Sequence, residues 1–132
     1  MTEIAPGLVG EKQVVVTEQY TARHLGSGGV NVLATPAMIM LMEQAALNAV
    51  DPLLPADQQT VGTRVDVQHL AATPMGMTVR ARAELLEVEG RRLKFRVEAY
   101  DDWEKVGEGL HERAIISLER FQQRLQAKVE KR

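Results

Sequence analysis

Apolar and polar residues alternate along most of the second half of this chain. In residues 79–85 and 93–99, every second position is Val, Ala, Leu or Phe, and the positions between them are charged. Residues 63–69 follow the same period, with Thr, Val, Val and His on one face and Arg, Asp and Gln on the other. A period of two predicts β-strands with one apolar face. Turn signals at 73–76, 89–90 and 101–104 predict hairpins that lead into a long final strand over 106–118.

Residues 35–50 have a different pattern, which predicts a helix. Pro36 suits the first helical position, Thr35 before it is a fair N-cap, and neither glycine nor proline follows up to Val50. The run from Met38 to Met42 covers every direction of the helical wheel. We therefore expect a helix that is apolar nearly all round and is buried by the rest of the protein.

One carboxylate, Glu43, lies in the middle of this apolar helix. Burying an ionised carboxylate is costly unless it is paired or its pKa shifts, so one interpretation is that Glu43 has a functional role. The other interpretation is that Glu43 and Gln44 form a narrow polar stripe, or that Glu43 pairs with an arginine.

The order of the predicted elements indicates the fold class. A β-branched cluster predicts a strand over Lys12–Tyr20 after a tail over residues 1–10, and a glycine-rich mobile loop over 21–29 leads to the helix. Four strands and a charged terminal helix over 121–131 follow. We expect an α+β protein of the hot-dog type, in which a five-stranded antiparallel sheet wraps around one central apolar helix. A free edge strand would pair two protomers into a homodimer.

Composition limits the classes of function. The 132 residues form one domain, 1–132, by their length, and the net charge of −2 gives no electrostatic case for nucleic acid or a membrane surface. No run approaches the ~20 apolar residues that span a bilayer, and the N-terminus lacks the regions of a signal peptide. The absence of cysteine excludes disulfides, thiolate metal sites and a cysteine nucleophile, and it fits a cytoplasmic protein.

Two further side chains join Glu43 as candidates for chemistry. His69 lies on the apolar strand face, where it is either an ordinary core histidine or a base and orienter beside Glu43 on the facing helix. Thr35 is either an N-cap or a hydroxyl that acts on a carbonyl, next to helix N–H groups that can hold an oxyanion. Eight residues, roughly 12 Å along one helix, separate Thr35 from Glu43. They act at opposite ends of one surface, or one comes from a second protomer, or the chain before the helix folds back.

The other histidines and glycines give weaker signals. The three histidines are scattered without metal-ligand spacing, so we expect no metal site. The glycines of 26–29 match no nucleotide-phosphate motif. Arg113 shares a strand face with His111, and it either binds an anion or carboxylate, or forms a surface ion pair with Glu112 or Glu108.

Several short segments carry a family resemblance. They are Arg23-His-Leu25, Leu41-Met-Glu43, Val61-Gly-Thr63, His69-Leu-Ala-Ala-Thr-Pro74, Val88-Glu-Gly-Arg-Arg-Leu93 and His111-Glu-Arg-Ala114. With these segments in order over roughly residues 14–128, the chain resembles the fluoroacetyl-CoA thioesterase and its thioesterase-like relatives. The resemblance implies a dimeric, metal-free hot-dog enzyme that hydrolyses acyl-CoA thioesters. It implies no cofactor, since coenzyme A is part of the substrate.

The resemblance also implies roles for five residues. The family's catalytic threonine, glutamate and histidine fall on Thr35, Glu43 and His69. Its glycine near the thioester carbonyl falls on Gly62, and its active-site arginine falls on Arg113. These assignments come from the resemblance and not from the spacing of the residues.

One segment departs from the family, and two other functions remain open. The stretch Gly26–Leu33 is shorter than the family's lid and has no aromatic residue, so we expect a small or medium acyl-CoA substrate and a preference that is broader than fluoroacetyl-CoA. A hot-dog dehydratase acting on 3-hydroxyacyl thioesters would also use a histidine and a carboxylate. A non-catalytic dimer that binds acyl-CoA or another small ligand is the third interpretation.

Overall fold

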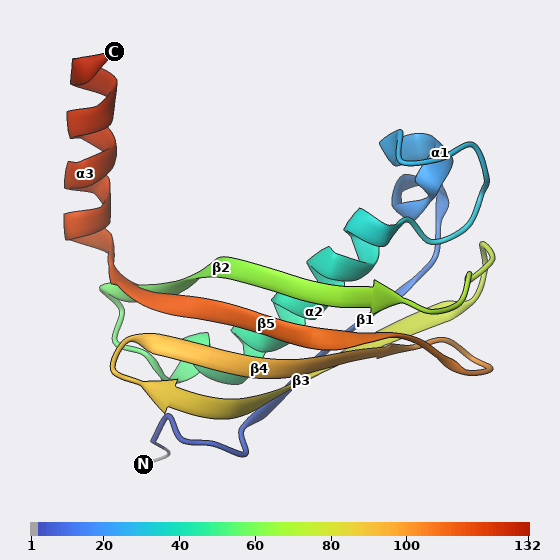
Figure 1. Ribbon diagram of the computed structural model, residues 1–132, viewed down its shortest axis with the longest axis horizontal. Coiled ribbons are helices and arrows are strands. Elements are labelled where there is room, and N and C mark those ends of the chain that lie inside the picture. The colour runs from blue at the N-terminus through green and yellow to red at the C-terminus, as the bar shows by residue number, and fades with distance from the viewer. Residues whose placement is uncertain (1–2) are drawn as a thin grey trace.

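The computed structural model describes residues 3–132, which form a curled antiparallel sheet with a long helix inside its curve (Figure 1). The strands and α-helices are β1 (Val9–Val15), α1 (Ala22–Leu25), α2 (Thr35–Val50), β2 (Gln58–His69), β3 (Thr78–Glu89), β4 (Arg92–Tyr100), β5 (Lys105–Ser117) and α3 (Leu118–Lys131). Short 3-10 helices occupy Glu18–Tyr20 and Asp51–Leu53. Within the described range, no helix is both long enough and apolar enough to cross a membrane.

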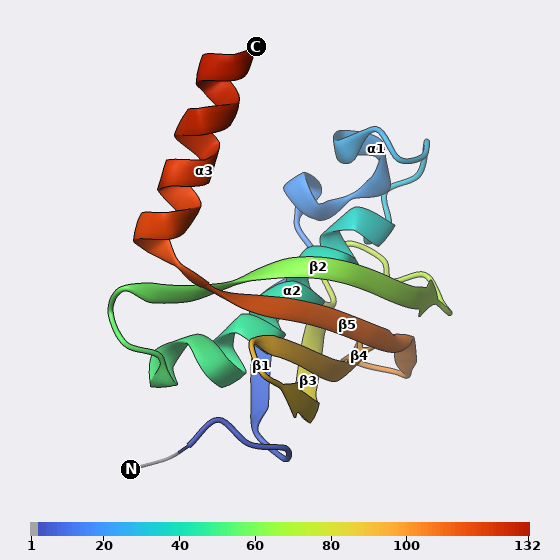
Figure 2. The same cartoon turned by 60° about the vertical axis from the view of Figure 1, so that its left-hand side comes forward.

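The strands lie in the order β1-β3-β4-β5-β2, and every neighbouring pair is antiparallel. β3, β4 and β5 follow one another through hairpins, while β1 and β2 form the two edges of the sheet. The turned view in Figure 2 shows the sheet curving around α2. The expected α+β arrangement, a five-stranded sheet around one helix with a further helix at the C-terminal end, is confirmed.

The apolar face of the sheet packs on α2. The inward residues of β3 and β4 are at most 1% exposed; they are Val79, Ala81, Ala83, Leu85, Leu93, Phe95, Val97 and Ala99. Two glycines let strands approach the helix closely. A Cβ on Gly10 would lie 2.1 Å from the backbone oxygen of Ala45, and a Cβ on Gly107 would lie 2.4 Å from the sulfur of Met38. Gly107 therefore lets the last strand lie directly against α2.

The first strand begins and ends earlier than its composition predicts. β1 covers Val9–Val15 and not Lys12–Tyr20, and Gly10 lies within it and not in a tail. Val16 leaves the ladder with β3 and turns inward, where it is 1% exposed and its backbone exchanges hydrogen bonds with Met77 and Gly76. A β-branched run favours extended backbone, but the contacts with β3 decide where pairing stops.

The prediction that α2 is buried all round is wrong for one side of the helix. Met38, Leu41 and Met42 are at most 1% exposed, as expected, whereas Met40 is 38% exposed and Leu47 is 36% exposed. Thr35, Pro36, Ile39, Met40, Glu43, Gln44, Leu47 and Asn48 form this open stripe. One sheet covers only one side of a helix, so the opposite stripe stays open in the single chain.

Two more segments differ from expectation. The predicted loop 21–29 contains α1, whose first turn is capped by Thr21 Oγ1 accepting from the backbone N–H of His24 at 3.2 Å. The terminal helix begins at Leu118 and not at Phe121, because Ser117 caps it. Both views show α3 standing away from the sheet and extending past the β2 edge (Figures 1 and 2).

Candidate functional site

Thr35 and His69 meet where the first turn of α2 lies against the end of β2. Thr35 Oγ1 is 2.8 Å from His69 Nδ1, at hydrogen-bonding distance. The period-two pattern correctly places His69 on the face of β2 that looks toward α2. A hydroxyl bonded to an imidazole is an arrangement in which the ring can orient the hydroxyl or take its proton.

The predicted N-cap role of Thr35 is wrong. The N-cap of α2 is Ala34, which makes no side-chain capping bond, and Thr35 is the first helical residue. Its hydroxyl points to His69 because a residue at this position faces the neighbouring strand. The first N–H groups of α2 have no intrahelical partner, so the positive end of the helix lies beside the Thr35 hydroxyl.

Burial favours the neutral form of His69. Burial lowers the pKa of His69 below its usual value. Its second ring nitrogen, Nε2, is buried and has no hydrogen-bond partner within the described part of the chain. A buried nitrogen without a partner is costly, so this atom is available to a group that the single chain does not supply.

A hollow of about 300 Å³ opens beside the Thr35–His69 pair. It is lined by Ala22, Ser27, Val32, Leu33, Thr35, His69, Leu70, Ala71 and Ala72. The segment 26–33 therefore covers part of the hollow, as the sequence predicts for a lid. Its ends are tied down, since Ala22 donates to the carbonyl of Val32 at 2.9 Å and Leu33 donates to that of Thr73 at 2.8 Å.

Glu43 lies over Gly62 of β2, away from His69. A Cβ on Gly62 would lie 2.5 Å from Glu43 Oε2, so any larger residue at this position would push the carboxylate aside. Thr63 next to it is the extra residue of a bulge, since Gly62 pairs with Arg113 and Arg64 pairs with Glu112. The Glu43 side chain remains 40% exposed on the open stripe of α2.

Arg113 is the cation that faces Glu43. Its side chain is 6% exposed, and Nη1 lies 3.6 Å from Glu43 Oε2. Nε donates to Thr60 Oγ1 at 2.9 Å, and Nη2 donates to the Thr60 carbonyl at 3.0 Å. The prediction that Arg113 forms a surface ion pair with Glu112 or Glu108 is therefore wrong. The interpretation that Glu43 pairs with an arginine is confirmed. A buried guanidinium needs such partners, and here they also fix its direction.

Thr60, Asp51 and His111 complete this group, and sequence reasoning assigned none of them to it. The Thr60 hydroxyl donates to Asp51 Oδ1 at 2.5 Å and accepts from Arg113. His111 Nδ1–H donates to the Arg64 carbonyl at 2.7 Å, which leaves Nε2 to accept from Arg113 Nη1 at 3.1 Å. The only signal in the sequence is the spacing of His111 and Arg113 on one strand face.

The neutral form of His111 makes stability depend on pH. Burial lowers the pKa of His111, and the Arg113 charge lowers it further, although Glu43 and Glu112 oppose this. In the unfolded chain a histidine takes up a proton below about pH 6.5. The folded state binds this proton less tightly than the unfolded state does. The free energy of unfolding therefore falls as the pH drops below this value.

We expect the melting temperature to fall less between pH 7.5 and 5.5 in His111→Gln than in the wild type. The variant lacks the proton uptake on unfolding, although His69, whose pKa is also lowered, retains its own share. Thermal unfolding at both pH values measures the difference, with the exposed His24→Gln as the matched control. Equal pH slopes in His111→Gln and the wild type would contradict a neutral His111.

The structure thus forms two groups within one chain, and it does not join them. His69 bonds Thr35, whereas Glu43 contacts Arg113 and lies 4.0 Å from His111 Nε2. Among the described residues, no hydrogen bond or ion pair joins Glu43 to His69, so the expected base-and-orienter pair does not form inside one protomer.

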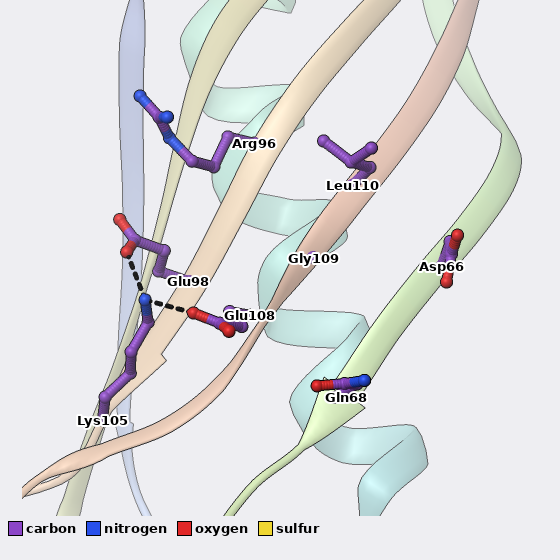
Figure 3. Close-up of a pocket in the computed structure, with 8 residues that line it drawn as sticks. All are labelled: Asp66, Gln68, Arg96, Glu98, Lys105, Glu108, Gly109 and Leu110. Carbon is purple, nitrogen blue, oxygen red and sulfur yellow. Dashed lines mark ion pairs between the residues drawn. The ribbon is translucent and has the colours of Figure 1, made fainter.

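Another hollow lies on the outer face of the sheet, away from α2 (Figure 3). Lys105 Nζ lies there between two carboxylates, at 2.8 Å from Glu98 and 2.5 Å from Glu108. Its bond to Glu108 is the main cause of its raised pKa, and Lys105 in turn lowers the pKa of Glu98. The other two charged residues of this hollow pair with residues outside it, Arg96 with Glu84 at 3.0 Å and Asp66 with Arg64 at 3.7 Å. This is typical of a solvated ion-pair network.

Comparison with known proteins adds a family to this geometry. The profile of the family "Fluoroacetyl-CoA-specific thioesterase" matches residues 16–119. A fluoroacetyl-CoA thioesterase of Streptantibioticus cattleyicolor is 43% identical over 129 residues, which cover 91% of this chain and 93% of that protein.

Solved structures agree with the sequence comparison. The fluoroacetyl-CoA thioesterase FlK superposes with a TM-score of 0.89 at 40% identity, covering 96% of this chain and 98% of the other. A thioesterase superfamily member from Thermus thermophilus has a TM-score of 0.87 at 33% identity over the whole of both chains. Variants of FlK have been solved with acetyl-CoA, or with fluoroacetate and CoA.

Proposed function

The chain belongs to the fluoroacetyl-CoA-specific thioesterase family, and from this premise we propose that it hydrolyses acyl-CoA thioesters to a free acid and CoA. The observation that carries the proposal is the Thr35–His69 pair at the start of α2, beside a hollow that can take a small acyl group. A hydroxyl beside the positive end of a helix suits the oxyanion of a thioester under attack.

The enzyme works as a homodimer that pairs through the β2 edges of two copies. β2 is an edge strand, and residues 62–66 along its middle are half-buried or exposed on both faces, unlike the strands inside the sheet. The open stripe of α2, with Met40 and Leu47, is apolar surface that a second copy would cover. A two-fold axis across the sheet joins two identical edges in antiparallel fashion.

The dimer completes the site. An antiparallel pairing brings the Gln58 half of one β2 toward the His69 end of the other. Glu43, which lies over Gly62, thereby moves toward the Thr35–His69 pair of the partner subunit. This arrangement accounts for the separation of the two groups within one chain and for the buried His69 Nε2 without a partner.

The chemistry follows from these positions. Glu43 either takes a proton from water as the water oxygen attacks the thioester carbonyl and later returns this proton to the leaving thiolate, or attacks the carbonyl carbon itself. In the second route the attack leaves a mixed anhydride on Glu43, which water then hydrolyses to the free acid. The carbonyl oxygen becomes an oxyanion that Thr35 and the first N–H groups of α2 stabilise. The C–S bond then breaks, and the CoA sulfur leaves as a thiolate that is protonated. Arg113, whose Nη1 lies 3.6 Å from Glu43 Oε2, holds the carboxylate in the direction of the reacting carbon.

The acyl preference differs from that of the fluoroacetyl-specific relatives. Segment 26–33, which covers the hollow, has no aromatic side chain. FlK has a phenylalanine, and variants in which alanine replaces it have been solved. An aliphatic, glycine-rich cover contacts a small acyl group less specifically than an aromatic one. We expect activity on several small or medium acyl-CoA esters, with no strong preference for the fluorinated one.

Thiol release from a panel of acyl-CoA esters tests the function. Acetyl, fluoroacetyl, phenylacetyl and medium-chain esters are mixed with the protein and a colorimetric thiol reagent. Release of free thiol from at least one ester supports the proposal. Conversion of a 3-hydroxyacyl ester to an enoyl ester without thiol release would identify a dehydratase instead. Esters that bind and stay intact would identify a binding protein.

Thr35 gives a test of the oxyanion role. Thr35→Ser keeps the hydroxyl, so most of the activity should remain, whereas Thr35→Ala should lower kcat by roughly 10²-fold. Because Ala34 and not Thr35 occupies the N-cap, both variants should keep the melting temperature of the wild type. Equal loss of activity in both variants would assign Thr35 to packing and not to chemistry.

A further inference from the structure

α3 separates its charges into stripes that nothing in the described structure neutralises. At 100° per residue, Arg120, Arg124, Lys128 and Lys131 share one side of the helix. Leu118, Phe121, Leu125 and Val129 form the adjacent apolar side, and Glu119, Gln122, Gln126 and Glu130 lie opposite. None of the nine ion pairs formed among residues 3–132 involves a cation of α3.

The cationic side of α3 is unfavourable for the isolated helix. Arg120, Arg124 and Lys128 follow each other at four-residue steps, and like charges at this spacing destabilise a helix by about 0.2–0.5 kcal/mol per pair. Residues 118–132 carry five cations and two acids, a net charge of +3, although the whole chain has a net charge of −2. A net anionic protein whose substrate carries phosphates needs a local cationic surface to receive it.

We propose that α3 binds the nucleotide end of coenzyme A, with its cations on the phosphates and its apolar side under the adenosine. The proposal rests on the proposed thioesterase function. The groove on α3 is lined by Phe121, Arg124, Leu125, Ala127, Lys128 and Lys131, so cations and an apolar floor occur together. CoA matches both, because its pyrophosphate and 3′-phosphate adjoin a planar aromatic base whose flat face can pack on apolar side chains.

The place of α3 in the fold agrees with this role. α3 begins directly after Ser117, which pairs with Gln58 at the start of β2. His69 ends β2 eleven residues after Gln58, about 36 Å from it along the strand. α3 is thus remote from the Thr35–His69 pair of its own chain. It lies four strand residues, about 13 Å, beyond Arg113, within reach of an extended pantetheine arm.

The dimer proposed above places the same end of β2 beside the partner's Thr35–His69 pair. α3 extends past the β2 edge, on the side where the second copy would lie (Figures 1 and 2). The nucleotide on α3 and the acyl group in the partner's hollow are then two ends of one substrate. The two cations of the outer-face hollow do not compete for this role, since Lys105 is held between two carboxylates and Arg96 pairs with Glu84 (Figure 3).

The test compares two substrates with the same acyl group, an acyl-CoA and the acyl-pantetheine that lacks the nucleotide. In the double variant Arg124→Gln/Lys128→Gln, we expect KM for the acyl-CoA to rise about tenfold, with kcat and all constants for the acyl-pantetheine unchanged. The increase in KM with ionic strength should be steep in the wild type and shallow in the variant, because exposed charges are screened. Lys12→Gln/Arg80→Gln removes the same charge from exposed positions at the other edge and should behave as the wild type.

Other outcomes overturn the proposal. An unchanged KM for the acyl-CoA would exclude α3 from nucleotide binding. Equal losses on both substrates, with dissociation of the dimer in size-exclusion chromatography, would make α3 an assembly element. Binding of the wild type to anionic phospholipid vesicles, without any affinity for adenosine 3′,5′-bisphosphate, would make it a membrane-surface helix.

A direct binding measurement separates this proposal from the thioesterase function. If the wild type hydrolyses neither substrate, the proposed function fails, and titration with adenosine 3′,5′-bisphosphate decides the further proposal alone. Binding that weakens about tenfold in Arg124→Gln/Lys128→Gln and not in Lys12→Gln/Arg80→Gln supports it. No binding to the wild type overturns it. Since α3 has no buried residue, these substitutions leave the core intact.

Discussion

Glu43→Gln is expected to lower kcat for acyl-CoA hydrolysis by about 10²–10⁴-fold, the range for loss of a general base. The amide keeps the size of the carboxylate over Gly62, so substrate binding should change little, but it can neither take a proton nor attack the carbonyl. Steady-state thiol release at saturating acyl-CoA measures the effect.

The control for this variant is Glu87→Gln, which changes the same group on the exposed end of β3. Its kcat should equal that of the wild type. Full activity in Glu43→Gln would remove Glu43 from the chemistry and leave its pairing with Arg113 as a structural contact. The melting temperature of Glu43→Gln should stay close to that of the wild type, because Thr60 still holds Arg113, so a fall in kcat reports on the chemistry.

His69→Ala is expected to reduce kcat by a similar factor of about 10²–10⁴. The substitution removes the ring that bonds Thr35 Oγ1, so the hydroxyl loses its orientation and any proton acceptor. In the wild type, kcat/KM should fall at acid pH, since protonated His69 cannot accept from Thr35. Because burial lowers the pKa of His69, this fall should lie below the usual histidine value of about 6.5.

The pH profile distinguishes chemistry from packing at this position. Residual activity in His69→Ala should lack the acid limb that the wild type has. Gln68→Ala, at the neighbouring exposed position of β2, is the matched control and should keep both the rate and the profile. An unchanged acid limb in His69→Ala would assign that limb to another group and contradict the role of His69.

Local patterns in the sequence predict the elements well, because each pattern is enforced within a few residues. The alternation in 79–85 and 93–99 predicts strands whose apolar face is buried, and the structure confirms both. The helix and its end at Val50 are confirmed, since Pro36 and the helix formers after it act locally, although the helix begins at Thr35 and not at Pro36. Segment 26–33, which the family resemblance aligns with a lid, lines part of the hollow beside Thr35.

The contacts of the candidate site depend on packing between distant segments. No spacing in the sequence indicates that Arg113 bonds Thr60 and not Glu112, since this follows from the register of β5 on β2. The bulge at Thr63 shifts that register by one residue and could not be predicted from a period of two. The sequence pattern places Glu43 on a helix and His69 on the strand that faces it. In the structure, Glu43 lies over Gly62 in the middle of β2, whereas His69 lies at the end of that strand.

The sequence by itself therefore determined the fold class, the central helix, the family and the identity of the candidate residues, because periodicity and motifs are local properties of the chain. The tertiary structure decided which of these residues meet: Thr35 with His69, and Glu43 with Arg113. It also decided that one side of α2 stays open, although every direction of that helix is apolar. The physical reason is that hydrogen bonds and burial depend on distances between segments far apart in the chain, which only the packing of the sheet around α2 sets.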